Sequence, residues 1–339
     1  MTAALNGVVV VDKPAGPSSF AIVHQARKLT GVRKVGHGGT LDPAASGVLP
    51  ICFGEGTKVA QFLLDADKEY LATVRLGAAT DSYDATGTVV SRCPAAHLSA
   101  AVIEEALGRF RGWITQTPPV FSALKRDGKP LYAYARAGEE VVVAARRVRI
   151  DALEVLELDA LGSAAPAVRL RVACSKGTYI RSLAHDLGAA LGVGGHLEAL
   201  RRTRSGPFTL AQAIPPEGLT AAASRLLSPA QALAGLPALT LSLEHSQAIS
   251  QGKAILWQDL GEPPPHAAAA KSQADPQAES RQGSEEESEE ESKEKSKEKS
   301  KAGARLVRFL DQSGTLVAVA PVAGPSERVR TLRVFGREG

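Results

Sequence analysis

Cysteine, aromatic residues and long apolar runs are all scarce in this sequence. Of its 339 residues, three are cysteines, at positions 52, 93 and 174, and they form no CxxC pair and no cluster with histidine. That spacing argues against a zinc site and against a disulfide framework. No run of 18 apolar residues occurs, which excludes a transmembrane helix, and the first residues lack the basic region of a signal peptide. We therefore expect a cytoplasmic protein without a bound metal.

One segment distorts the net charge. Residues 262–303 are low in complexity, lack large apolar side chains and contain 11 acidic and 7 basic residues. Such a segment cannot recover the entropy of ordering its backbone, so we interpret it as a solvated spacer. The other 297 residues carry 33 basic and 25 acidic side chains, a net charge of +8. A basic folded part favours a polyanionic partner.

The periodicity of apolar residues in the first two-thirds of the chain predicts strands mixed with helices. Strands are predicted at 7–12, 68–76, 146–155 and 167–174. Helices are predicted from Ser18 or Ser19 to residue 29, and at 57–64, 98–107 and 180–191. The strands return mainly antiparallel, so we predict an α+β fold with a mixed, largely antiparallel sheet.

A small β-rich domain is predicted at the C-terminal end. Residues 247–257 have the pattern of a short helix, a glycine and a strand, and residues 305–310 and 314–319 alternate as two strands joined by a turn. The spacer at 262–303 therefore interrupts this domain, which is tolerable because closure entropy rises slowly with loop length. We place the domain boundary between residues 235 and 236.

The segment GHGGTLDPAASGVLP, at 36–50, is the most unusual in the chain. Its first glycines flank a histidine and would let a ligand approach the backbone closely. Asp42 stands directly before Pro43. Taken alone, this pair is explained at least as well by a helix start, with Asp42 as N-cap, Pro43 as first helical residue and 44–46 as the first turn. A histidine in such a loop is likewise more often a turn residue than a catalyst.

Together with its neighbours, this segment resembles the central motif of the bacterial tRNA pseudouridine-55 synthases, the TruB family. Five further segments resemble the family in the same order: VVVDKPAGPSS at 9–19, DKEYLATVRLGAATDSYDATG at 67–87, QTPPVFSALKRDGKPLYAYAR at 116–136, CSKGTYIRSLAHDLG at 174–188 and HLEALRRTRSGPF at 196–208. The resemblance implies a pseudouridine synthase fold at 1–235, with an RNA-gripping insertion at about 116–150. It also implies, on a weaker match, a PUA-like RNA-binding domain at 236–339.

The resemblance implies an enzyme that isomerises the uridine at position 55, in the T loop of tRNA. The reaction breaks the N1–C1′ bond, turns the uracil and joins C5 to C1′, with no redox change and no group transfer, so no cofactor is expected. It needs a carboxylate near the glycosidic bond, as nucleophile or electrostatic stabiliser, and the resemblance assigns this role to Asp42. We expect a monomer whose partner is the T-arm of tRNA and which requires no protein partner.

The resemblance assigns further roles around this carboxylate. Arg181 pairs with it, which would keep it ionised and oriented. Tyr70 stacks on the target base and is a candidate for proton transfer. Tyr179 and Leu200 enclose the flipped uridine, and His37 contacts the extruded nucleotide. Without the resemblance, Arg181 would be interpreted as a solvated helix residue and Tyr70 as part of the core.

Access to the uridine makes a second demand. Extruding a base costs on the order of a few kcal/mol, and contacts between basic side chains and phosphates must offset this cost. We predict such contacts from Lys13, Lys125 and Arg126. The last two lie in the segment that resembles the family's RNA-gripping insertion.

Three alternatives to a stand-alone tRNA enzyme were weighed. The same catalytic motif occurs in guide-RNA-dependent pseudouridine synthases, which work inside a ribonucleoprotein; the insertion at 116–150 and the weaker match of the C-terminal region favour the stand-alone type. A tRNA-folding chaperone on the same scaffold would not need Asp42, Tyr70 and Arg181 together. A metal-dependent RNA enzyme would need a cluster of ligands that the sequence lacks.

Overall fold

The computed structural model describes residues 5–126, 128–139, 141–261 and 305–336, and within them the chain divides into two compact units between Leu226 and Leu227. The predicted spacer at 262–303 lies outside the described residues. None of the described helices is both long enough and apolar enough to cross a membrane.

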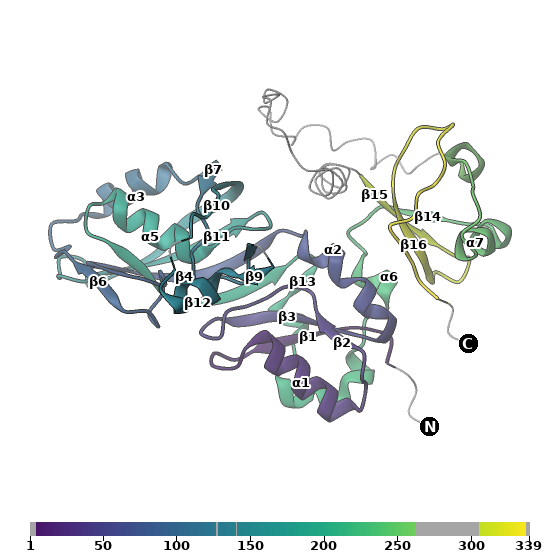
Figure 1. The fold of residues 1–339 in the computed structure, drawn as a ribbon, viewed down its shortest axis with the longest axis horizontal. Helices are drawn as coiled ribbons and strands as arrows, with labels where there is room; N and C mark the ends of the chain where they lie inside the picture. Colours follow the sequence, from purple (N-terminus) through teal and green to yellow (C-terminus); the bar gives the residue numbers. More distant parts are fainter. Residues whose placement is uncertain (1–4, 127, 140, 262–304, 337–339) are drawn as a thin grey trace. The chain divides into compact units, whose positions relative to one another are not determined.

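The first unit combines a large sheet with helices and two small hairpins (Figure 1). Its strands are β1 Gly7–Lys13, β2 Val35–His37, β3 Ser46–Phe53, β4 Lys68–Leu76, β5 Ala78–Thr80, β6 Val89–Arg92, β7 Gly112–Gln116, β8 Lys125–Arg126, β9 Lys129–Pro130, β10 Arg146–Asp159, β11 Ala167–Cys174, β12 Gly195–Ser205 and β13 Phe208–Thr209. Its α-helices are α1 Ser19–Thr30, α2 Ala60–Leu64, α3 Ala100–Gly108, α4 Leu131–Ala137 and α5 Ile180–Ala190.

The large sheet runs in the order β1-β3-β12-β4-β11-β10-β7, with β2 paired to β3 and β13 paired to β12. Its described pairings are antiparallel apart from the parallel pairing of β12 with β3. This confirms the predicted α+β class and the mixed, largely antiparallel sheet. The buried core comes from the strands together with α1, α3 and α5. Strands β3 and β12, which are far apart in the sequence, lie side by side in the sheet.

Local sequence signals explain how several elements begin and end. Helix α1 starts after Ser18, whose hydroxyl accepts a hydrogen bond from the Ala21 N–H at 3.1 Å, and it stops at Gly31, which adopts a left-handed φ of 71°. The outer edge of β1 is covered by Ile214, whose N–H and carbonyl both bond to β1. A covered edge is consistent with the almost wholly buried, apolar residues of this strand.

Three features of the first unit differ from what the local sequence patterns suggest. The alternative explanation of Asp42–Pro43 as a helix start is not supported: the Ala45 N–H bonds to the Asp42 carbonyl at 3.0 Å in a single turn, and strand β3 follows at once. The predicted helix at 57–64 is divided into a 3-10 segment, Gly54–Lys58, and the short α2. Strand β12 had not been predicted from its charged sequence.

The second unit is small and rich in strands. It contains β14 Ala238–Thr240, β15 Leu306–Leu310, β16 Leu316–Pro321 and β17 Arg333–Val334 in one sheet, with helices α6 Pro229–Ala232 and α7 Leu243–Ser250 (Figure 1). The predicted hairpin of β15 and β16 is confirmed. The strand predicted before the spacer is wrong: Ile255 and Trp257 are buried in alternation, but the segment makes only one bridge, from Leu256 to Arg328.

Candidate functional site

The loop between β2 and β3 carries Asp42, and a buried arginine fixes the residues that precede it. The guanidinium of Arg202, in β12, donates to the carbonyls of Gly39 and Thr40 at 3.1 Å each, and its Nε donates to Val48 at 2.8 Å. Its side chain is almost completely buried. Carbonyl oxygens at these distances satisfy a buried cation and prevent the loop from moving away from the sheet.

The residues next to Asp42 are held as well. The hydroxyl of Ser19 bonds to both the N–H and the carbonyl of Leu41, at 2.8 and 2.9 Å. On the other side, the carbonyl of Pro43 accepts hydrogen bonds from the Gly16 N–H at 2.8 Å and from Lys13 Nζ at 3.1 Å. With its backbone fixed on both sides, Asp42 keeps a side chain that is 43% exposed.

A glycine in the motif allows the close parallel contact of β3 with β12. Gly47 has a φ of +105°, and a Cβ added there would lie 2.1 Å from the Arg202 carbonyl oxygen. No side chain larger than hydrogen fits at that distance. Gly47, the fourth glycine of the motif, therefore places β3, and with it the Asp42 loop, against the strand that carries Arg202 and Leu200.

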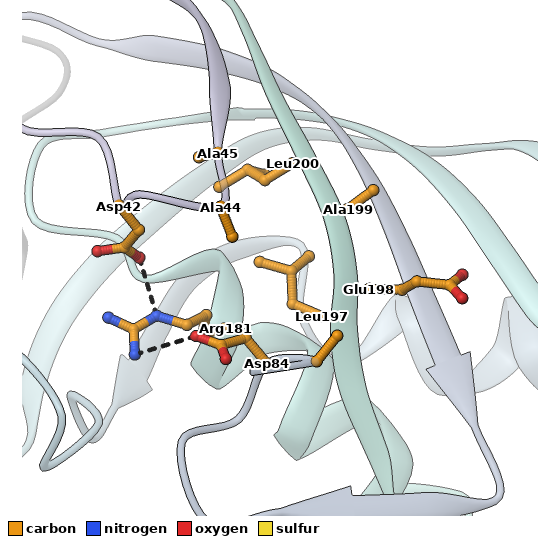
Figure 2. Close-up of a pocket in the computed structure, with 10 residues that line it drawn as sticks. Asp42, Ala44, Ala45, Asp84, Arg181, Leu197, Glu198, Ala199 and Leu200 are labelled. Carbon is orange, nitrogen blue, oxygen red and sulfur yellow. Dashed lines mark ion pairs between the residues drawn. The ribbon is translucent and has the colours of Figure 1, made fainter. Parts of the chain in front are cut away.

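Asp42 and Arg181 both line a hollow, and their side chains point toward each other (Figure 2). Arg181 Nε is 3.0 Å from Asp42 Oδ2, and Arg181 Nη1 is 3.6 Å from Asp84 Oδ2 and 3.2 Å from the Ser82 carbonyl. The guanidinium side chain is 7% exposed, so its charge is balanced inside the protein by two carboxylates. The hollow is lined by Asp42, Ala44, Ala45, Asp84, Ala85, Arg181, Leu197, Glu198, Ala199 and Leu200.

Asp84 is a member of this site that the sequence analysis missed. Its Oδ1 accepts hydrogen bonds from the Thr86 N–H at 2.9 Å, the Thr86 hydroxyl at 2.6 Å and the Ser82 hydroxyl at 2.8 Å. These bonds fix the carboxylate and leave Oδ2 directed at Arg181. The segment TDSYDATG had been matched to the family, but nothing in its spacing indicates which aspartate meets an arginine in a distant helix.

Tyr70 and Leu200 lie on one face of the sheet. Tyr70, in β4, is directly opposite Arg202, and Leu200 is opposite Ala72, two residues further along β4. Opposed residues share a face and so do residues two apart. Leu200 lines the hollow, whereas Tyr70 is buried and is not part of the lining. Burial raises the pKa of the Tyr70 phenol, which therefore stays protonated at neutral pH.

The other two predicted nucleotide contacts, His37 and Tyr179, do not line the hollow. His37 ends β2, and its Nδ1 accepts a hydrogen bond of 3.4 Å from the Gly39 N–H. Burial lowers the pKa of His37, which favours the neutral imidazole. Tyr179 stands immediately before α5, with its ring partly exposed and the guanidinium of Arg146 4.9 Å from the ring centroid.

The predicted contact between Lys13 and phosphate is corrected by the structure. Lys13 is completely buried, and its Nζ donates to the carbonyls of Pro14, Pro17 and Pro43 at 2.9, 2.7 and 3.1 Å. An ammonium with three carbonyl partners inside the protein has no side open to a phosphate. Lys13 instead ties the loop after β1 to the residue that follows Asp42. Burial lowers its pKa to about 8.

Buried Lys13 should make stability depend on pH. Its pKa is about 8 in the folded protein against an ordinary 10.5, so between these values the unfolded chain binds more protons than the folded one. The free energy of unfolding therefore rises with pH across this window, and the contribution is lost as the pH falls through 8. Lys13→Met lacks this contribution. Denaturant unfolding should therefore show the free energy of unfolding of the wild type rising relative to that of the variant from pH 8 to 10.5.

Comparing wild type with a variant cancels the effect of other groups that titrate between pH 8 and 10.5. Burial also lowers the pKa of Lys68 to about 8, but Lys68 is present in both proteins and cancels in the difference. Lys28→Met, at an exposed position of α1, is the matched control and should give a difference that does not change with pH. A pH-independent difference for Lys13→Met would contradict the assignment.

Lys125 and Arg126 form β8 of a short hairpin with β9, and both side chains are exposed. Arg126 also donates to the Val142 carbonyl at 3.0 Å. Neither residue lines the hollow. If they bind RNA, they contact it at a different part of the surface from the hollow.

The three cysteines are free, with Cys52 and Cys174 buried and Cys93 exposed. Burial raises the pKa of both buried thiols to about 12. Among the described residues, no three histidine, cysteine, aspartate or glutamate side chains gather as a metal site would require.

Two family models identify the fold as that of a known class, the pseudouridylate synthases. A family model described as "TruB family pseudouridylate synthase (N terminal domain)" matches residues 27–180, and one described as "tRNA pseudouridylate synthase B C-terminal domain" matches residues 181–233. The chain therefore belongs to the TruB family, as predicted. The second model ends close to the boundary between the two units, so the PUA-like character of the second unit stays a prediction.

Relatives resemble most of this chain. A protein of Ralstonia nicotianae named tRNA pseudouridine synthase B is 52% identical over 259 residues, which are 75% of this chain and 82% of that protein. Its namesake in Francisella tularensis subsp. novicida is 54% identical over 216 residues, covering 63% of this chain and 70% of the relative. One chain of a solved Cbf5-Nop10-Gar1 complex is 27% identical to this chain and matches its fold with a TM-score of 0.68. The match covers 97% of this chain and 85% of the chain in the complex.

Proposed function

We propose that this protein isomerises a uridine of tRNA to pseudouridine, at position 55 in the T loop, by a cofactor-free mechanism that depends on Asp42. The observation that carries the proposal is the 3.0 Å ion pair between the exposed carboxylate of Asp42 and the buried guanidinium of Arg181, in the lining of a hollow. The names of the relatives support tRNA as the substrate.

The chemistry follows from the charges at the site. A carboxylate beside the sugar can act on the glycosidic bond as nucleophile or as electrostatic stabiliser only if it stays ionised and correctly oriented. Arg181 supplies a positive charge that is itself fixed by Asp84 and the Ser82 carbonyl. Tyr70 is the candidate for proton transfer after the new C5–C1′ bond has formed, when the proton on C5 has to leave.

Base flipping accounts for the rest of the site. A uridine inside a folded T loop must leave its stack, and an apolar wall and an aromatic face replace the lost stacking. In this proposal Leu200 provides the wall, Tyr70 and Tyr179 provide aromatic faces, and His37 contacts the extruded nucleotide.

The direct test is to incubate purified protein with an unmodified tRNA transcript, without guide RNA or added metal, and to map pseudouridine. The expected result is one new pseudouridine at position 55, and none in a transcript with cytidine at that position. Modification at a different uridine would support the activity but contradict position 55 as the target. No modification at all would contradict the proposed function.

The second candidate is a guide-RNA-dependent enzyme with the same catalytic motif, and the likeness to a chain of the Cbf5-Nop10-Gar1 complex shows that this fold also occurs in an assembly of several proteins. It predicts that the naked transcript is modified only after guide RNA and protein partners are added. The third candidate, a tRNA-folding chaperone, predicts faster tRNA folding that does not depend on Asp42. We favour the stand-alone enzyme because the relatives named tRNA pseudouridine synthase B share about half of the residues over most of the chain.

The exposed pair Lys125 and Arg126 should contribute electrostatic affinity. Replacing both by alanine removes two possible phosphate contacts and should weaken tRNA binding about evenly across RNA sequences. The slope of log K against log salt concentration should become shallower by about 1 to 2. The measurement is the Kd for tRNA at several salt concentrations.

A control with the same change in charge separates local contacts from net charge. Arg92 and Arg109 are exposed in β6 and after α3, and their double alanine variant should leave the slope nearly unchanged. If both double variants shift the slope equally, the two basic residues of β8 act only through the net charge.

A further inference from the structure

Two strands enclose the segment between residues 117 and 145, which contains β8, β9 and α4. Gln116 is the last residue of β7 and Arg146 the first of β10, and these two residues are directly opposite each other in the antiparallel pairing. We call this pair the stem of the insertion. Both of its side chains contact the residues that lead into α5.

Gln116 binds the backbone of Tyr179 through both ends of its side-chain amide. Its Oε1 accepts the Tyr179 N–H at 2.8 Å, and its Nε2 donates to the Tyr179 carbonyl at 3.0 Å. The Gln116 side chain is 1% exposed. One buried amide thus satisfies both polar backbone groups of a single residue, which fixes that residue more strictly than one bond would.

Arg146 holds the same residue from the other side. Its guanidinium carbon is 4.9 Å from the centre of the Tyr179 ring, and its Nη2 donates to the Gly177 carbonyl. Gly177 has a φ of +81°, a left-handed conformation that glycine adopts without strain. The glycine therefore allows the turn that presents its carbonyl to Arg146. Contacts of an arginine with an aromatic face restrict the orientation of both groups.

A third contact extends this arrangement toward the ion pair. The Ser182 hydroxyl, in the first turn of α5, donates to the carbonyl of Thr117, the residue that follows Gln116. Arg181 lies between Tyr179 and Ser182 in the sequence. Gln116 and its neighbour Thr117 thus contact the chain two residues before and one residue after Arg181, the residue that pairs with Asp42.

From these contacts we infer that Gln116 and Arg146 are positioning residues of the reaction: the stem of the insertion holds Tyr179 in place for the flipped nucleotide. The inference rests on the proposed function. It explains how an insertion that binds RNA at its exposed β8 hairpin is mechanically joined to the site of chemistry. Neither residue touches the reacting atoms; both act through Tyr179.

The experiment measures single-turnover isomerisation at saturating tRNA, separately from the Kd for tRNA. Gln116→Leu has a similar volume and makes neither bond to Tyr179. It should slow the single-turnover step roughly tenfold or more, because misplacing a positioned group affects the rate more than the binding, while the Kd stays within about threefold. An equal loss in both quantities would indicate general damage to the RNA interface and overturn the inference.

The second variant, Arg146→Ala, keeps the inference testable if Gln116→Leu does not fold, because Arg146 is only partly buried. It is combined with Tyr179→Ala in a double-mutant cycle. If Arg146 acts through the ring, its removal slows the wild type roughly tenfold but changes the Tyr179→Ala variant little. Equal losses in both backgrounds would show that Arg146 acts elsewhere.

Arg169→Ala is the matched control. Arg169 is an exposed arginine of β11 in the same sheet, paired with Glu157, and its removal should change neither the rate nor the Kd. Wild-type protein is assayed beside every variant. If the wild type forms no pseudouridine, the proposed function fails; if it is active and the stem variants match it in rate, only the role of the stem fails.

Discussion

Asp42→Asn should abolish isomerisation while tRNA binding stays nearly unchanged. The amide has the shape of the carboxylate and can stay beside Arg181, but it has no charge and is a poor nucleophile. Loss of a group that acts on the reacting bond slows enzymes by at least about a thousandfold, often more. The measurement is the single-turnover rate of pseudouridine formation, with the Kd for tRNA determined on the same protein.

Two further observations make this result specific. Asp159→Asn, at an exposed position at the end of β10, makes the same chemical change away from the hollow and should keep the full rate. Asp42→Asn should still fold, because the backbone of the loop is held by Arg202 and Ser19 and Arg181 keeps Asp84 as a partner, although loss of one of the two carboxylates that balance Arg181 should lower its stability. Substantial turnover by Asp42→Asn would remove this residue from the mechanism.

Much of the fold could be predicted because its signals are local. The alternation of apolar residues in β4 is visible in the sequence, and so are the serine and glycine that bound α1. Strands β3 and β12 carried no such signal. Strand β3 follows a glycine-rich loop that looks like a helix start, and β12 places charged residues such as Arg202 in the interior. Their pairing is decided by contacts between distant segments, and single-sequence patterns do not contain these.

The site was predictable to the extent that it resembles a family. Asp42 and Arg181 were paired by resemblance, and the structure places them 3.0 Å apart. Lys13 was misassigned because lysine is normally a surface residue, and nothing in the sequence shows that three carbonyls surround its ammonium. Asp84 was missed because its role depends on a guanidinium supplied by a helix that follows much later in the chain.

Arg181→Lys should slow isomerisation by roughly a hundredfold to a thousandfold although the charge is conserved. The arginine directs Nε to Asp42 and Nη1 to Asp84 at the same time. A lysine ammonium is a single point and cannot reproduce this fork between two fixed carboxylates. Because the side chain is buried, the substitution should also lower stability, by up to about 3–5 kcal/mol if one carboxylate is left without its cation.

Asp84→Asn separates these two effects. If Asp84 acts by fixing Arg181, its loss should slow the reaction by about tenfold to a hundredfold, and adding it to Arg181→Lys should cause little further loss, since the fixed group is already gone. Multiplied losses in the double variant would mean that Asp84 contacts the substrate directly. A wild-type rate for Arg181→Lys, measured below its unfolding transition, would mean that Asp42 needs only a nearby positive charge, and that the geometry of the fork has no part in catalysis.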